Sequence, residues 1–150
     1  LNWLLFGMGI FFIIGNKFGG YIADNGGIHR LGGIYIAMTI LYLLFGPLLS
    51  FKWIAIIIVA LLCIAFSSYG SSTQLMFLDI AEKEYPQSLD LASSLNSIFA
   101  NIGISLGSFT ASQAVAFLPM RNLGYVGAVY GLAATILVLV LSKKYTGMRF

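Results

Sequence analysis

The sequence predicts an all-α membrane protein with five transmembrane helices. Of its 150 residues 59% are hydrophobic and only 9% are charged, and the mean hydropathy is +0.94. Soluble domains carry about 25% charged residues, so this chain has too few charges to cover a water-soluble globule of its size. Apolar runs of about 20 residues recur along it, and such runs form helices in lipid because a helix satisfies its own backbone groups.

Short polar or proline-containing segments separate the predicted spans. Pro47 breaks the end of the second span, Pro86 lies between the third and the fourth, and Pro119 ends the fourth. No linker is long enough to mark a second domain. Because the chain opens inside an apolar run without an initiator methionine, we expect a longer protein. The predicted spans are residues 2–23, 31–50, 53–78, 91–117 and 123–142.

The basic residues are divided unequally between the two sides of the membrane. One side receives Arg30, Lys83, Lys143, Lys144 and Arg149. The other side receives Lys52 and Arg121. The positive-inside rule places the first side in the cytoplasm. The sequence therefore predicts a multi-pass protein of the plasma membrane with a cytoplasmic C-terminus.

Polar side chains form stripes on the spans 53–78 and 91–117, whereas the spans 31–50 and 123–142 have few and are predicted to be peripheral. Residues three or four apart share a helix face, and uncompensated polar groups are costly in lipid. The stripes favour a water-accessible substrate cavity, although each serine alone could simply bond neighbouring helices. The cavity candidates are Asn16, Ser67, Ser71, Gln74, Ser97, Asn101 and Ser105.

Two pairs of glycines spaced by four residues predict close helix packing. Gly15 and Gly19 lie on the first span, and Gly103 and Gly107 lie on the fourth. Glycines at this spacing leave a smooth face on which another helix backbone can approach closely.

The sequence contains no pattern typical of an enzyme. Every acidic residue falls in a connection or at a helix end, and His29 is alone in a loop. No catalytic set, no metal-ligand spacing and no cofactor motif is present. The scattered basic residues do not indicate nucleic-acid binding, and Cys63 is a lone cysteine in an apolar run. We therefore expect no catalysis, no cofactor and no metal.

The stretch GNKFGGYIADNGGIHRLGG, residues 15–33, resembles the loop between two helices that recurs in each half of major facilitator superfamily proteins. The family pattern is roughly G-x-x-x-D-(R/K)-x-G-(R/K)-(R/K). Gly20, Asp24 and Gly27 match its spacing, and Arg30 supplies a basic side chain slightly later. The resemblance implies that these four residues belong to the cytoplasmic gate, whose tight loop is expected from Asp24 to Arg30.

Residues 69–108 resemble the tenth and eleventh helices of the drug:proton antiporter branch, and most closely its arabinose-efflux-like and purine-efflux-like members. The matching positions are Gln74, Met76, 92–96, Asn101, Gly103 and Gly107. The resemblance implies that the chain is helices 8–12 of a twelve-helix fold, and so a partial C-terminal six-helix bundle. It also implies alternating access, in which two helix bundles rock around a central site.

The expected function is proton-coupled efflux of small organic compounds, which could be drugs, sugars or nucleobase-like molecules. The expected partners are the lipid bilayer, the transported compound and protons, whose carrier acid should lie in the missing N-terminal part. Two alternatives stay open: a symporter of the same fold that imports a sugar or metabolite, and a non-transporting membrane scaffold. Lys17 could extend toward the cytoplasmic boundary, pair with Asp24 or contact substrate.

Overall fold

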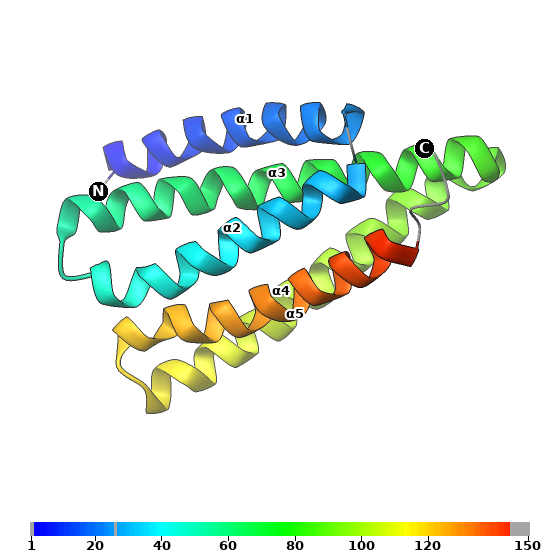
Figure 1. The fold of residues 1–150 in the computed structure, drawn as a ribbon. Coiled ribbons are helices and arrows are strands. Elements are labelled where there is room, and N and C mark those ends of the chain that lie inside the picture. The colour runs from blue at the N-terminus through cyan, green and yellow to red at the C-terminus, as the bar shows by residue number, and fades with distance from the viewer. Residues whose placement is uncertain (1, 26, 145–150) are drawn as a thin grey trace.

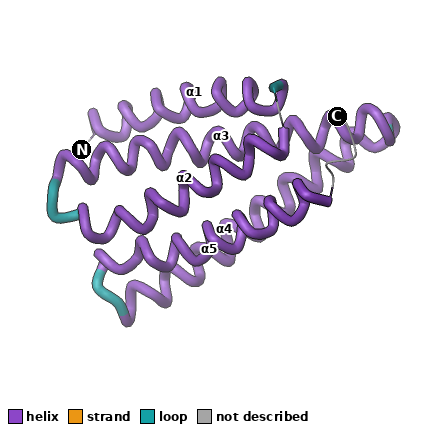
Figure 2. The backbone as a smooth tube through the Cα atoms, in the orientation of Figure 1, coloured by secondary structure: helices purple, strands orange, loops and turns teal. Residues whose placement is uncertain are grey.

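A computed structural model describes residues 2–25 and 27–144, and over these ranges its regular secondary structure is helical, with short loops between the helices (Figures 1 and 2). Arg149 lies outside the described residues. Five long helices follow one another, with one 3₁₀ turn before α4 and another before α5. Their bounds are α1 Asn2–Asp24, α2 Gly27–Leu48, α3 Lys52–Glu84, η1 Pro86–Ser88, α4 Leu89–Phe117, η2 Met120–Asn122 and α5 Leu123–Lys144.

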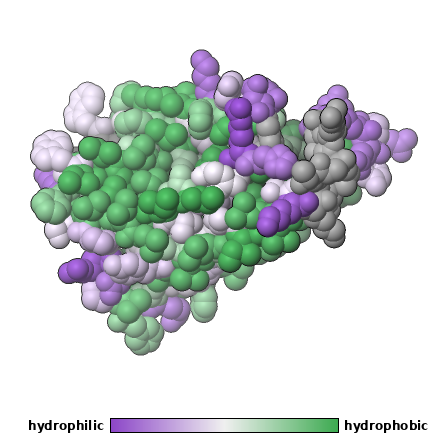
Figure 3. Space-filling model, viewed as in Figure 1, coloured by the Kyte–Doolittle hydropathy of each residue, from purple (hydrophilic) through white to green (hydrophobic). Residues whose placement is uncertain are grey.

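Each of the five helices is long and apolar enough to cross a membrane. In Figure 3 hydrophobic residues cover the left and the middle of the visible face, and hydrophilic residues gather mainly toward its right-hand end, with a few at the lower left. This banding is what a bilayer protein needs, because the hydrocarbon core is about 30 Å thick. The described residues therefore form an all-α membrane protein, as the sequence predicts.

The helices pack in an order that differs from their order along the chain. α3 lies between α1 and α2, and α2 packs on α5 as well as on α3 (Figure 1). Ile22 of α1 joins Leu31, Ile34 and Met38 of α2 in a buried cluster, against which Tyr69 of α3 packs. This cluster holds the three helices together at the end where α1 turns into α2.

The turn between α1 and α2 is shorter than the predicted loop from Asp24 to Arg30. α1 continues through Asp24, and α2 begins at Gly27, so Arg30 is helical. The Asn25 side chain donates to the Tyr21 carbonyl oxygen at 3.0 Å and so caps the end of α1. α2 begins before its predicted start at residue 31, because Leu31 and Ile34 are buried against Ile22 and stabilise its first turns.

α3 continues six residues beyond its predicted end, to Glu84. The Lys83 ammonium lies 2.9 Å from the Asp79 carboxylate, one helical turn away, and Ala81 is buried. A helix of 33 residues is about 50 Å long at 1.5 Å per residue. Its last turns therefore extend beyond a hydrocarbon core of about 30 Å.

α2 and α5 pack on each other through glycines of α5. A methyl group at Gly124 would lie 2.5 Å from the Tyr42 carbonyl oxygen, and one at Gly131 would lie 2.5 Å from Thr39 Oγ1. The outer faces of both helices remain apolar and exposed, as Ile40 and Ile136 illustrate. Both helices therefore combine a closely packed face with an apolar outer face.

Candidate functional site

The candidate site is built where α1 crosses α3 at two glycines. A methyl group at Gly15 would lie 2.6 Å from the Ile64 carbonyl oxygen and 2.9 Å from Ser67 Cβ. At Gly19 it would overlap the backbone of Ser68. Only a residue without a side chain fits at either position, so these contacts set the distance and the register between the two helices.

This register brings Asn16 of α1 beside two serines of α3. Asn16 Oδ1 accepts from Ser71 Oγ at 2.5 Å and lies 2.7 Å from Ser67 Oγ. We call these three residues the Asn16 cluster. Ser67 is buried, whereas Asn16 is exposed. The structure thus joins three of the seven cavity candidates through hydrogen bonds.

The Ser67 hydroxyl has two acceptors within reach but only one proton. Its oxygen lies 2.8 Å from the Phe12 carbonyl oxygen and 2.7 Å from Asn16 Oδ1. A serine hydroxyl donates one hydrogen bond at a time, so it can serve either acceptor. Because both acceptors belong to α1, each alternative keeps α1 and α3 linked.

Two carboxamides on this side of the molecule keep donors unused. Within the described residues, the Asn16 NH₂ group and the whole Gln74 side chain have no hydrogen-bond partner. Both residues are exposed, and Gln74 follows Ser71 by almost one turn of α3. The Asn16 cluster together with Gln74 therefore offers amide donors to whatever occupies the adjacent space.

The polar stripe of α4 stands apart from this cluster. Ser97 Oγ donates to its own helix, at the Ser93 carbonyl oxygen. Asn101 and Ser105 are exposed and have no hydrogen-bond partner among the described residues. Of the 29 residues of α4, only Ala92 is buried. No other described part of the chain therefore covers the stripe, and α4 itself packs on α3 and α5.

The two predicted glycine pairs lie in different surroundings. Gly15 and Gly19 contact the α3 backbone. A methyl group at Gly103 or Gly107 would meet no atom within 4 Å in the part of the chain that the structure describes. Another helix therefore covers the glycine pair of α1, whereas no described residue covers the equally spaced pair of α4.

The four gate residues lie at the two helix ends rather than in an extended loop. Gly20 and Asp24 belong to α1, and Gly27 and Arg30 belong to α2. The Arg30 guanidinium lies over the Tyr21 ring, 5.7 Å from its centroid. Across the described ranges, neither Asp24 nor Arg30 forms an ion pair, and Asp24 does not pair with Lys17.

Three further interactions were missed from the sequence. Ser68 is buried against Gly15, with Oγ 2.9 Å from the Gly15 carbonyl oxygen. Thr110 and Tyr130 share a hydrogen bond of 2.6 Å that links α4 to α5. Phe66 and Tyr69 meet edge-on at 5.2 Å within α3. A glycine on one helix and a serine on another give no signal of contact until their register is known.

No group of three or more metal-binding side chains occurs among the described residues. The chemistry on offer is hydrogen bonding from hydroxyls and amides. Such groups can orient a polar ligand through hydrogen bonds.

The chain is similar to bacterial membrane transporters. It is 26% identical over 136 residues to an uncharacterized MFS-type transporter, YtbD, of Bacillus subtilis, covering 89% of this chain and 34% of that protein. It is 31% identical over 83 residues to a probable sugar efflux transporter of Mannheimia succiniciproducens, covering 55% of this chain and 20% of that protein. A probable sugar efflux transporter of Helicobacter acinonychis is 31% identical over 105 residues, which are 67% of this chain and 26% of that protein.

No family model matches the chain, and no solved structure matches it. The chain spans about a third or less of the length of these relatives. The similarity to YtbD nevertheless extends over most of the described helices. The resemblance drawn from residues 15–33 and 69–108 is thus supported by similarity over 55–89% of this chain: its homologues are major facilitator-type and sugar efflux transporters.

Proposed function

We propose that this chain is part of the C-terminal half of a secondary active transporter that exports small organic compounds by alternating access. The relatives named as transporters support membrane transport, and they favour a non-enzymatic role. The five helices would be helices 8–12 of a twelve-helix protein. The protein would lie in the plasma membrane with its C-terminus in the cytoplasm.

The observation that carries the proposal is the unpaired amide of Asn16. Eight residues separate Asn16 from the end of α1, which is about 12 Å along the helix. A carboxamide this far inside a membrane needs partners, because an unpaired polar group is costly in hydrocarbon. Its oxygen is already bonded to α3, so its NH₂ group is left for water or for a ligand.

Hydroxylated compounds such as sugars are the substrate class that these groups suit best. The free NH₂ of Asn16 would donate to a ligand oxygen, and the Gln74 amide could both donate and accept. Two of the relatives are named as probable sugar efflux transporters, which supports the same class. The cavity would also use Ser67, Ser71, Ser97, Asn101 and Ser105.

Proton coupling would depend on an acid outside this chain. The five acidic residues lie in the last turns of α1 and α3 or in the first turn of α4. None lies at a depth where it could exchange protons beside a central site. We propose that the carrier acid belongs to the N-terminal part of the full-length protein, and that Gly20, Asp24, Gly27 and Arg30 form the cytoplasmic gate.

The test uses the full-length protein in inside-out bacterial membrane vesicles. A radiolabelled panel of sugars, nucleosides and cationic drugs would be offered while respiration acidifies the vesicle interior. We expect uptake of a sugar that a protonophore abolishes. No uptake of any compound would refute transport of these classes, and uptake that survives the protonophore would refute proton coupling.

The site is tested in the same vesicles with Asn16→Leu, which keeps the approximate volume but removes the amide. We expect the transport rate to fall at least about tenfold, because the ligand atom that bonds the Asn16 amide would lose its hydrogen-bond partner in the cavity. Asn122→Leu is the matched control, because Asn122 lies in the η2 turn, outside both the proposed cavity and the proposed gate. Equal transport by the wild type and Asn16→Leu would contradict the site.

A further inference from the structure

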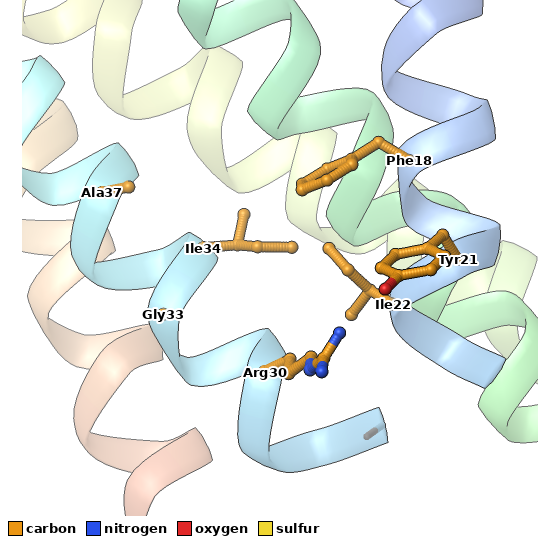
Figure 4. Close-up of a pocket in the computed structure, with 7 residues that line it drawn as sticks. All are labelled: Phe18, Tyr21, Ile22, Arg30, Gly33, Ile34 and Ala37. Atoms are coloured by element: carbon orange, nitrogen blue, oxygen red, sulfur yellow. The ribbon is translucent and has the colours of Figure 1, made fainter. Parts of the chain in front are cut away.

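A groove of about 330 Å³ lies between the last turns of α1 and the first turns of α2, on a surface that the transport proposal uses only at Arg30 of the cytoplasmic gate (Figure 4). Its walls are apolar, and a single cationic side chain, Arg30, lies among them. In Figure 4 the Phe18 and Tyr21 rings and Ile34 point toward the space between the two helices. The lining residues are Phe18, Tyr21, Ile22, Arg30, Gly33, Ile34 and Ala37.

The groove extends from the membrane boundary into the hydrocarbon. Arg30 lies in the first turn of α2, three residues from its start at Gly27. Ala37 lies seven residues further along α2, which is about 10 Å deeper. One end of the groove is therefore at headgroup level, and its other end is at the level of acyl chains.

The charge at the shallow end favours an anion. Within the described residues the Arg30 guanidinium has no carboxylate partner and only lies over the Tyr21 ring. The first turn of α2 contains no acidic residue, and a helix N-terminus carries partial positive charge. Asp24 is nearby in the chain but does not line the groove.

We propose that this groove binds an anionic phospholipid, with its phosphate at Arg30 and one acyl chain against the exposed lining residues Phe18, Gly33 and Ala37. A zwitterionic lipid would bring a cationic headgroup together with its phosphate, so it would complement the charge of Arg30 less well than an anionic lipid does. A soluble phosphate would leave the apolar walls in contact with water. The proposal requires that the helices cross a membrane and that the rest of the full-length protein leaves the groove open to lipid. It stands or falls independently of whether the protein transports anything.

The test is native mass spectrometry of the purified full-length protein, titrated with phosphatidylglycerol or with phosphatidylcholine of the same acyl chains. We expect bound phosphatidylglycerol to exceed phosphatidylcholine. Arg30→Gln should reduce phosphatidylglycerol occupancy about fivefold, because the attraction between one basic residue and an anionic lipid surface changes the binding affinity by about that factor. Arg30→Lys should keep most of the binding.

A second variant tests the apolar part without a change of charge. A methyl group at Gly33 would meet no atom within 4 Å, so Gly33→Leu places its side chain in the groove without disturbing the helices, and it should also displace the lipid. Arg121→Gln, at the opposite membrane side, and Gly9→Leu, at the other end of α1, are the matched controls and should bind as the wild type does. Unchanged occupancy in both Arg30→Gln and Gly33→Leu, or equal losses in the controls, would overturn the proposal. Glycerol phosphate binding as strongly as phosphatidylglycerol would overturn it in favour of a soluble anion.

Discussion

Replacing Gly15 by alanine should push α1 away from α3 and break the Asn16 cluster. The added methyl group would lie 2.6 Å from the Ile64 carbonyl oxygen, which is a backbone atom that cannot rotate away. Ordinary contact between carbon and oxygen begins near 3.4 Å. The two helices must therefore separate by roughly 0.8 Å at this point.

This separation has two measurable consequences. The Asn16 Oδ1 to Ser67 Oγ distance of 2.7 Å would grow to roughly 3.5 Å, beyond a hydrogen bond. Forcing one extra carbon into a closely packed contact costs about 1–3 kcal/mol. Gly15→Ala should therefore lower both the stability of the protein and its transport rate.

The assay is thermal unfolding of the full-length protein in detergent, followed by vesicle transport for the variants that fold. Gly9→Ala is the matched control, because the same methyl group on the same helix would meet no atom within 4 Å. We expect a melting temperature several degrees lower for Gly15→Ala and little change for Gly9→Ala. Equal melting temperatures for the two variants would refute the assigned contact between α1 and α3.

The remaining predictions concern α3, α4 and the chain as a whole. Thr110→Val should destabilise the protein by about 1 kcal/mol, because it removes the hydrogen bond to Tyr130. Thr73→Val should be neutral or stabilising, because the Thr73 hydroxyl is buried without a hydrogen-bond partner among the described residues. Thermal unfolding compares the two variants, and equal losses of stability would contradict this interpretation. In a cysteine-free background, Asn101→Cys should react with a membrane-impermeant maleimide, whereas Phe99→Cys, about 160° round α4, should not; labelling of Phe99→Cys alone would contradict a wet face at Asn101. Vesicles that contain only residues 1–150 should show no proton-driven uptake, and measurable flux would refute a carrier acid outside this chain.

The number and positions of the helices could be predicted from the sequence because the membrane thickness fixes the length of an apolar span. The ends could not be predicted as well, since they depend on local contacts. α2 begins four residues before the predicted start because Leu31 and Ile34 are buried against Ile22. α3 continues to Glu84 through the ion pair between Lys83 and Asp79, which stabilises the helix. Hydropathy predicts an end of the span at these charged residues, because it does not recognise that they pair.

The candidate site could be predicted as single residues but not as an arrangement. Helical spacing places Ser67 and Ser71 on one face of α3, yet only the register set by Gly15 and Gly19 brings Asn16 to them. Gly103 has the same spacing to the next glycine as Gly15 has, yet no described residue packs against it. Glycine spacing therefore predicts a smooth helix face but not whether another helix covers that face. The roles of these residues in a cavity stay a prediction.

The hydrogen bonds of Ser67 suggest how α1 could move on α3 at little cost. When Asn16 turns toward a ligand, the Ser67 hydroxyl can donate to the Phe12 carbonyl oxygen at 2.8 Å, so no buried hydroxyl loses its partner. Ser71 is only half-buried and can bond water instead. Because Gly15 and Gly19 present no side chain to α3, a small tilt meets no interlocked side chains at these two positions. On the proposed transport function, the contact that positions the amide of Asn16 would thus also release it, as alternating access requires.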